Sequence, residues 1–161
     1  MEIIVINKAL GQWTAEGYQS KIEAVLNLAA SYLGYQKKFR HSALSVVLAD
    51  DKFVRGLNNV YRGQNKPSNI LSFAENPDIN DWPEESEDYG LGDLVLSFDT
   101  IMQESRDQGK VFEHHLYHLL IHGFLHLLGY DHVEAEAGEV MEALEIDILQ
   151  KLDISNPYNI D

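Results

Sequence analysis

The chain of 161 residues contains no cysteine, which excludes disulfide bonds and thiolate metal ligands. It has no apolar run long enough to cross a membrane, and its first residues lack the basic and apolar pattern of a secretion signal. We therefore expect a cytoplasmic protein with no membrane partner. With 45% hydrophobic and 24% charged residues, the composition is that of a soluble globular protein.

Positive charge is also scarce, because 12 lysines and arginines stand against 26 aspartates and glutamates, a formal net charge of −14. Taken as a whole, so acidic a protein would repel nucleic-acid phosphates. The basic residues are unevenly spread, however. Residues 37–66 hold seven of them and only two acids, so this segment carries +5 and the remainder −19. A basic segment on an acidic body can still bind RNA.

Five basic residues of this segment are candidate RNA contacts: Lys37, Lys38, Arg40, Arg55 and Lys66. For the group at 37–40, a loop that simply interacts with water is an equally good interpretation. The sequence leaves both interpretations open.

Hydrophobic periodicity predicts four strands, at residues 2–7, 44–49, 69–73 and 93–98. Helices are predicted at 15–34, directly after Asp50, and at 99–108, 111–128 and 134–152. Thr14 and Asp50 are expected as N-caps, and Gly34 as the end of the first helix. This order indicates an α/β (α+β) fold, in which a small mixed four-stranded sheet packs against about five helices.

We expect a single domain over residues 1–154, an exposed loop at 75–90 and a loose tail at 155–161. The glutamates of the last helix are most simply a solvated face. They are Glu134, Glu136, Glu139, Glu142 and Glu145.

Three histidines, His122, His126 and His132, are spaced i, i+4 and i+10. Residues four apart lie on one face of a helix, so two neutral imidazoles there can share one metal ion. On a straight helix the third would lie about 15 Å beyond the first, so the helix must end before it. Gly129 lies between them, and glycine readily adopts the left-handed conformation that ends helices. The spacing predicts a metal site at the end of a His-bearing helix, with a fourth position open to water.

Other histidines of this helix compete for the role. His118 and His122 have the same spacing, but only the pair His122 and His126 lies beside the turn that returns His132. We therefore predict that His118 is a neighbour of the site, touching a ligand or the substrate. His114 and His115 are predicted to be solvated. Three imidazoles also suit nickel, cobalt and copper, so the spacing alone does not select zinc.

The residue after the first histidine is Gly123, whereas zinc proteases with a similar spacing carry a glutamate there as general base. This absence disfavours peptide hydrolysis. Metal-assisted cleavage of a phosphodiester is still possible, because it requires only a metal that lowers the pKa of its bound water and a cation that neutralises the phosphate.

The run from His122 to His132 reads H-G-F-L-H-L-L-G-Y-D-H. It resembles the signature H-G-x-L-H-L-x-G-Y-D-H of the YbeY family, the metal-dependent endoribonucleases and ribosomal RNA maturation factors of bacteria. Residues 57–62, 67–73, 91–97 and 141–145 also resemble family segments, in the same order. The resemblance covers roughly residues 44–150 of the chain.

This resemblance implies one zinc ion per chain on His122, His126 and His132, and a catalytic role for Arg62. The chemistry agrees, because a guanidinium stays charged and can bind phosphate oxygens through two donors. Without the family, a surface salt bridge would explain Arg62 equally well. Asp131 could orient a ligand or accept a proton, or cap the turn, and we favour the turn.

The chain departs from the family at Ser68-Asn69, where Thr-Asp is frequent. Ser68 keeps the hydroxyl and stays a candidate site residue. Asn69 removes a negative charge, which weakens the idea that a carboxylate there orients Arg62.

The implied function is zinc-dependent, single-strand-directed cleavage of RNA in the maturation of small-subunit (16S) ribosomal RNA and in ribosome quality control. Ribosomal or assembly-factor proteins are further expected partners. Two alternatives stay open: a non-catalytic assembly factor with a structural metal, and a hydrolase of peptides or another substrate class. Gly123 counts against the second alternative.

Overall fold

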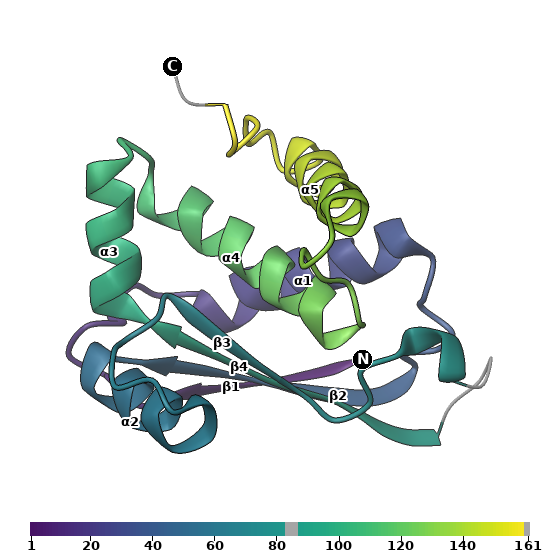
Figure 1. Ribbon diagram of the computed structural model, residues 1–161, viewed down its shortest axis with the longest axis horizontal. Helices are drawn as coiled ribbons and strands as arrows, with labels where there is room; N and C mark the ends of the chain where they lie inside the picture. Colours follow the sequence, from purple (N-terminus) through teal and green to yellow (C-terminus); the bar gives the residue numbers. More distant parts are fainter. Residues whose placement is uncertain (83–86, 160–161) are drawn as a thin grey trace.

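The computed structural model describes residues 1–82 and 87–159, with only the backbone at 87–89. Its sheet has four strands in the order β1-β2-β4-β3 (Figure 1). β1, β2 and β4 run parallel, and β3 is antiparallel to β4 at one edge. The strands are β1 Glu2–Asn7, β2 His41–Ala49, β3 Ile70–Ala74 and β4 Glu87–Ser97. The predicted mixed four-stranded sheet is confirmed.

Helices α1, α3, α4 and α5 lie on one side of the sheet, and α2 covers part of the other side (Figure 1). The α-helices of the described residues are α1 Tyr18–Leu33, α2 Asp51–Arg62, α3 Phe98–Asp107, α4 Phe112–Leu127 and α5 Ala135–Gln150. A short 3-10 helix, η1, spans Ile79–Asp81. The α/β fold with about five helices is therefore confirmed. None of the described helices is both long and apolar enough to cross a membrane.

Helix α4 is the centre of the core. It packs on β3 and β4, with α1, α3 and α5 around it. Leu116, Leu120 and Phe124 are completely or almost completely buried, and burial of each such side chain stabilises the fold by about 1.5–3 kcal/mol. With its apolar sides held in this way, α4 presents the remaining side, which carries histidines, in a fixed orientation.

The capping predictions are partly confirmed. Asp50 accepts a hydrogen bond from the backbone N–H of Phe53 at 2.8 Å, and Gly34 ends α1 with a φ of +77°. The prediction of Thr14 as N-cap is wrong, because α1 begins at Tyr18 after Gly17. A tertiary contact explains the difference. Trp13 is buried and donates its indole N–H to Ala49 O at 2.9 Å, which anchors the segment before α1 in a non-helical conformation.

Strand β4 begins at Glu87 instead of residue 93, and β2 begins at His41 instead of 44. The early part of β4 pairs with the start of β2, with irregular register between His41 and Leu44. The prediction of an exposed loop over 75–90 is thus wrong for η1 and for residues 87–90, while residues 83–86 lie outside the described part. Pairing with a neighbouring strand, which the local pattern does not reveal, decides the structure here.

The expectation of a loose tail is wrong for residues 155–159. The hydroxyl of Tyr158 donates to Glu145 Oε2 at 2.6 Å, and Pro157 O accepts a hydrogen bond from Lys110 Nζ at 3.1 Å. The last two residues, 160 and 161, lie outside the described part. The C-terminal segment thus packs beside α4 and α5.

Candidate metal centre

The three histidines of the motif meet at the C-terminal end of α4. After Leu127 the chain turns back through Gly129, whose φ is +101°, and Tyr130 N donates to Leu125 O at 3.1 Å. This turn returns His132 to the helix that carries His122 and His126. One ring nitrogen from each histidine lies within 4.8 Å of the others.

Hydrogen bonds of the outer ring nitrogens define the tautomers of two of these histidines. The Nδ1 atom of His126 lies 3.0 Å from Tyr130 O, and a carbonyl oxygen can only accept, so Nδ1 carries the proton. The Nδ1 atom of His122 likewise faces the carboxylate of Glu145 at 2.7 Å. In the neutral rings, both Nε2 atoms therefore carry lone pairs, and they lie only 3.0 Å apart.

Two lone pairs at this distance repel each other unless a cation lies between them. A proton shared by the rings is disfavoured, because burial and the neighbouring His122 lower the pKa of His126. Three imidazole nitrogens are, by contrast, a donor set that divalent transition metals accept. The residues present therefore fit a metal ion.

Glu145 on α5 is the site residue that the sequence analysis missed. It was predicted to be solvated, but it is completely buried. Burial raises the pKa of Glu145, yet hydrogen bonds from His118, His122 and Tyr158 outweigh this effect and lower the pKa to about 2. One signal could have found it: Glu145 lies four residues after Met141 and three before Ile148, on the apolar side of the helix.

The remaining histidines of α4 take different positions. His118 lies next to the three-histidine cluster, 3.2 Å from Glu145 through its Nε2 atom. His114 is exposed, as expected. The prediction for His115 is wrong, since it is only 4% exposed and its Nε2 atom lies 3.2 Å from Glu104 Oε1. Helical phase decides this difference, because His115 points into the space between α4 and α3.

A groove of about 1440 Å³ runs along the histidine side of α4. The cluster of His122, His126 and His132 lines it together with Arg62 and Lys66. Its walls also include much of β3 and the C-terminal segment. The groove is far larger than one phosphate group, so it has room for a chain-like substrate.

Arg62, at the end of α2, is held in place from β3. Its Nη2 atom donates to Ser72 O at 2.9 Å, and its guanidinium carbon lies 5.5 Å from the ring centre of Phe73. No carboxylate of the described residues lies within 4.0 Å of its nitrogens to form an ion pair. The salt-bridge interpretation of Arg62 therefore finds no support among the described residues.

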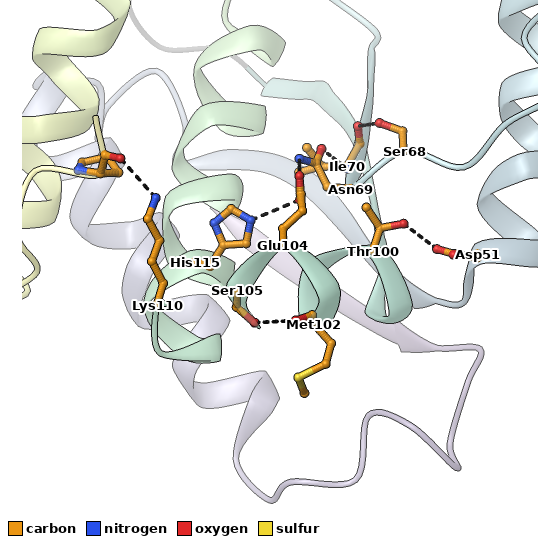
Figure 2. A network of polar contacts seen from close by, with 11 residues as sticks. Asp51, Ser68, Asn69, Ile70, Thr100, Met102, Glu104, Ser105, Lys110 and His115 are labelled. Carbon is orange, nitrogen blue, oxygen red and sulfur yellow. Dashed lines mark hydrogen bonds and ion pairs between the residues drawn. The ribbon is translucent and has the colours of Figure 1, made fainter. Parts of the chain in front are cut away.

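A second polar cluster lies further along the groove, and Figure 2 shows it with Glu104 at its centre. The Nδ2 atom of Asn69 donates to both carboxylate oxygens of Glu104, at 3.0 and 3.2 Å. Burial raises the pKa of Glu104, but hydrogen bonds from His115 and Asn69 outweigh it, so this pKa is lowered. Asn69 therefore pairs with Glu104. An aspartate at 69 would place two carboxylates face to face.

The other predicted residues are not all at the groove. Ser68 lines it, and its hydroxyl donates to Ile70 O at 3.1 Å. Asp131 accepts from Val133 N at 3.2 Å, which is the turn role that we favoured. Of the five basic candidates only Lys66 is among the residues lining the groove.

The other four basic candidates lie outside the lining of the groove. Lys38 donates to the carbonyl oxygens of Ile79 and Trp82, at 3.2 and 3.4 Å, so it joins the segment before β2 to η1. Lys37, Arg40 and Arg55 are exposed.

Comparisons with known proteins agree with this description. A sequence profile of the family described as Endoribonuclease YbeY matches residues 5–153. A protein of Sinorhizobium medicae with that name is 42% identical over 160 residues, covering 96% of this chain and 94% of the relative. Another from Paramagnetospirillum magneticum is 48% identical over 115 residues, covering 71% of this chain and 70% of the relative.

A solution structure of a Thermotoga maritima protein has the same fold, with a TM-score of 0.56 at 22% identity, covering 98% of this chain and 99% of the other. At that identity the likeness supports the fold alone. The profile and the relative from Sinorhizobium medicae span nearly the whole sequence, including the histidine cluster and the groove. This chain therefore belongs to the Endoribonuclease YbeY family.

Proposed function

We propose that this protein is a metal-dependent endoribonuclease whose substrate strand lies in the groove along α4. One observation carries the proposal: the Nε2 atoms of His122 and His126 face each other at 3.0 Å in the same groove as Arg62. Relatives across most of the chain bear the name endoribonuclease, which supports RNA as the substrate.

The residues that would hold the metal are His122, His126 and His132, and zinc is the ion we expect. When bound, such an ion supplies positive charge and makes water more acidic. Gly123 follows the first ligand and cannot act as a base, which again disfavours peptide hydrolysis.

Arg62 binds the scissile phosphate in this proposal. A guanidinium has five N–H groups, and the bond to Ser72 O uses one of them, so the others can donate to phosphate oxygens. Because β3 holds Arg62 in place before the substrate binds, the guanidinium does not have to reorient when negative charge develops on the phosphate. Ser68 and Lys66 line the same groove and would contact the RNA strand near this phosphate.

We further propose that the substrate is single-stranded RNA and that the biological role is maturation of small-subunit ribosomal RNA and ribosome quality control in the cytoplasm. Ribosomal or assembly-factor proteins would then present the RNA. These proposals rest on the family resemblance. We also propose that residues 1–154 form the domain and that 155–161 are an appendage to it.

The test compares RNA cleavage by Arg62→Ala, His126→Ala and Arg55→Ala, where Arg55 is an exposed control on the same helix. We expect cleavage to fall about 100-fold or more in the first two variants, the scale of losing a group that stabilises transition-state charge. Arg62→Ala should keep its metal, and Arg55→Ala should cleave normally. Unchanged cleavage by both site variants would remove this site from the reaction.

The same preparations test the alternatives. Loss of thermal stability on chelation, together with no RNA turnover by the metal-loaded protein, would indicate an assembly factor with a structural metal. Activity on a panel of peptides, with none on RNA, would indicate a hydrolase of another class.

A further inference from the structure

Glu145 is unusual among the acids whose side chains the structure describes, because it is completely buried and its hydrogen bonds lead to residues that line the groove. Its Oε1 atom lies 2.7 Å from His122 Nδ1 and 3.2 Å from His118 Nε2. Its Oε2 atom accepts the hydroxyl hydrogen of Tyr158 at 2.6 Å. No lysine or arginine of the described residues forms an ion pair with it.

A buried carboxylate is expensive for a fold. Moving an ionised group out of water is strongly unfavourable unless hydrogen bonds compensate, and an apolar side chain of similar size would pack there without that penalty. Packing of α5 on α4 therefore does not explain why this position is a glutamate. The hydrogen bonds of Glu145 to His118, His122 and Tyr158 do explain it.

We propose that Glu145 is a positioning residue of the metal centre, which fixes His122 in the tautomer that presents its Nε2 lone pair and keeps His118 out of the ligand set. The inference rests on the proposed function only in taking the three-histidine cluster as the metal site. Tyr158, in the C-terminal segment, also belongs to this arrangement, because its hydroxyl donates a hydrogen bond to the second carboxylate oxygen of Glu145.

The tautomer argument follows from one hydrogen bond. A free neutral imidazole exchanges its proton between the two nitrogens, and only an unprotonated nitrogen can bind a metal. The carboxylate at Nδ1 holds the proton on that atom, so in the neutral ring of His122 the lone pair is on Nε2. Such outer hydrogen bonds typically change metal affinity by about 10–100-fold.

The same carboxylate resolves the competition between the two histidine pairs. The pair His118 and His122 has the spacing of a metal site, but His118 Nε2 faces Glu145 and so must donate a hydrogen there. A nitrogen that carries a hydrogen cannot bind a metal. Glu145 therefore gives the two histidines different roles: the Nε2 atom of His122 is left free to bind a metal, whereas the Nε2 atom of His118 is not, and His118 is not part of the three-histidine cluster.

Tyr158 connects the end of the chain to this arrangement. Its hydroxyl lies 2.6 Å from Glu145 Oε2 and 3.2 Å from His118 Nε2, and Pro157, Tyr158 and Asn159 all line the groove. Since the ring of Tyr158 is at the surface, removing only its hydroxyl leaves the core intact. Tyr158→Phe is therefore a mild test of the same relationship.

The experiment measures Zn²⁺ affinity by calorimetry and the tautomer of His122 by long-range ¹H–¹⁵N NMR on the metal-free protein of 161 residues. The variants are Glu145→Leu, Glu145→Gln and Tyr158→Phe, with Glu142→Gln on the exposed side of α5 as the matched control. Thermal melting of each metal-free variant shows whether it is folded.

We expect Glu145→Leu to melt at a lower temperature than the original protein, because the Tyr158 hydroxyl and His118 lose their acceptor, and, while still folded, to bind Zn²⁺ about 10–100-fold more weakly, with the proton of His122 distributed over both nitrogens. Glutamine retains one acceptor, so Glu145→Gln should recover part of the affinity. Tyr158→Phe should weaken binding by only a few-fold, and Glu142→Gln should change nothing.

The inference is overturned if the folded Glu145 variants bind Zn²⁺ as tightly as the original protein, or if His122 already carries its proton on Nε2 in that protein. If Glu145→Leu does not fold, Tyr158→Phe and the tautomer of the original protein decide the question. Failure of the unaltered protein to bind any Zn²⁺ would instead contradict the proposed function, so the two failures are distinguishable.

Discussion

Gly123 of α4 lies so close to Ile70 of β3 that a Cβ atom on the glycine would be 2.6 Å from Ile70 Cδ1. The same atom would lie 2.9 Å from Leu94 Cδ2. This close approach lets α4 pack on the edge strand β3, so that the histidines of α4 and Ser72 of β3, which holds Arg62, line one groove. A glutamate at 123, as in zinc proteases, has no space in this arrangement.

We predict that Gly123→Ala destabilises the protein despite the higher helix propensity of alanine. Overpacking of this kind costs about 1–3 kcal/mol. Gly56→Ala in α2 is the matched control, because its Cβ would meet no atom within 4 Å and the change should stabilise by about 0.5–1 kcal/mol. Urea unfolding measures both, and a stabilised Gly123→Ala would contradict the packing described.

Metal addition should stabilise the protein by mass action. Zn²⁺ at about 100 times its dissociation constant adds about 2.7 kcal/mol to the free energy of unfolding, which for a chain of this size raises Tm by roughly 5–10 °C. His126→Ala should abolish most of this increase, and His114→Ala, on the exposed side of α4, should keep it. If Zn²⁺ raised the Tm of both variants equally, His126 would not be a ligand and the metal would bind at another site.

Glu104 predicts a pH dependence of stability. Because its pKa is lowered in the folded protein, its hydrogen bonds to His115 and Asn69 stabilise the fold above the unfolded pKa, near 4.3, and this stabilisation disappears as the pH falls through the folded value. Glu104→Gln should therefore be less stable than the original protein at pH 7, with a smaller difference at pH 3.

The measurement is urea unfolding of both proteins at the two pH values. Glu139→Gln, on the exposed side of α5, serves as control. A difference between Glu104→Gln and the original protein that stays constant from pH 7 to pH 3 would contradict the lowered pKa.

Lys66 and Lys37 should differ in RNA binding. Lys66 lines the groove, whereas Lys37 does not. On metal-free protein, so that RNA is not cut, Lys66→Gln should weaken binding of a single-stranded RNA and reduce the slope of log K against log salt by about 0.7, the value for one phosphate contact. Lys37→Gln should leave both quantities unchanged. If Lys37→Gln weakened binding and Lys66→Gln did not, the RNA would bind at the segment before β2 and not in the groove.

Local patterns predicted much of the fold. The β-branched run of β1, the cap at Asp50 and the end of α1 at Gly34 all depend on neighbours within a few residues, and all three are confirmed. The early part of β4 was missed because its partner, the start of β2, lies more than 40 residues away in sequence. Pairing between strands depends on the topology of the sheet, and a short stretch of sequence carries no information about a partner so far away.

The sequence by itself determined that His122 and His126 share a helix face and that the chain turns at Gly129, because the helical period and the freedom of glycine act over a single turn. Only the tertiary structure decided that Glu145, among the four glutamates of α5, is buried against His118 and His122. It also brought Arg62 into the same groove and packed Tyr158 beside it. These contacts join segments far apart in sequence, and the packing of α4 against β3 and α5 sets them.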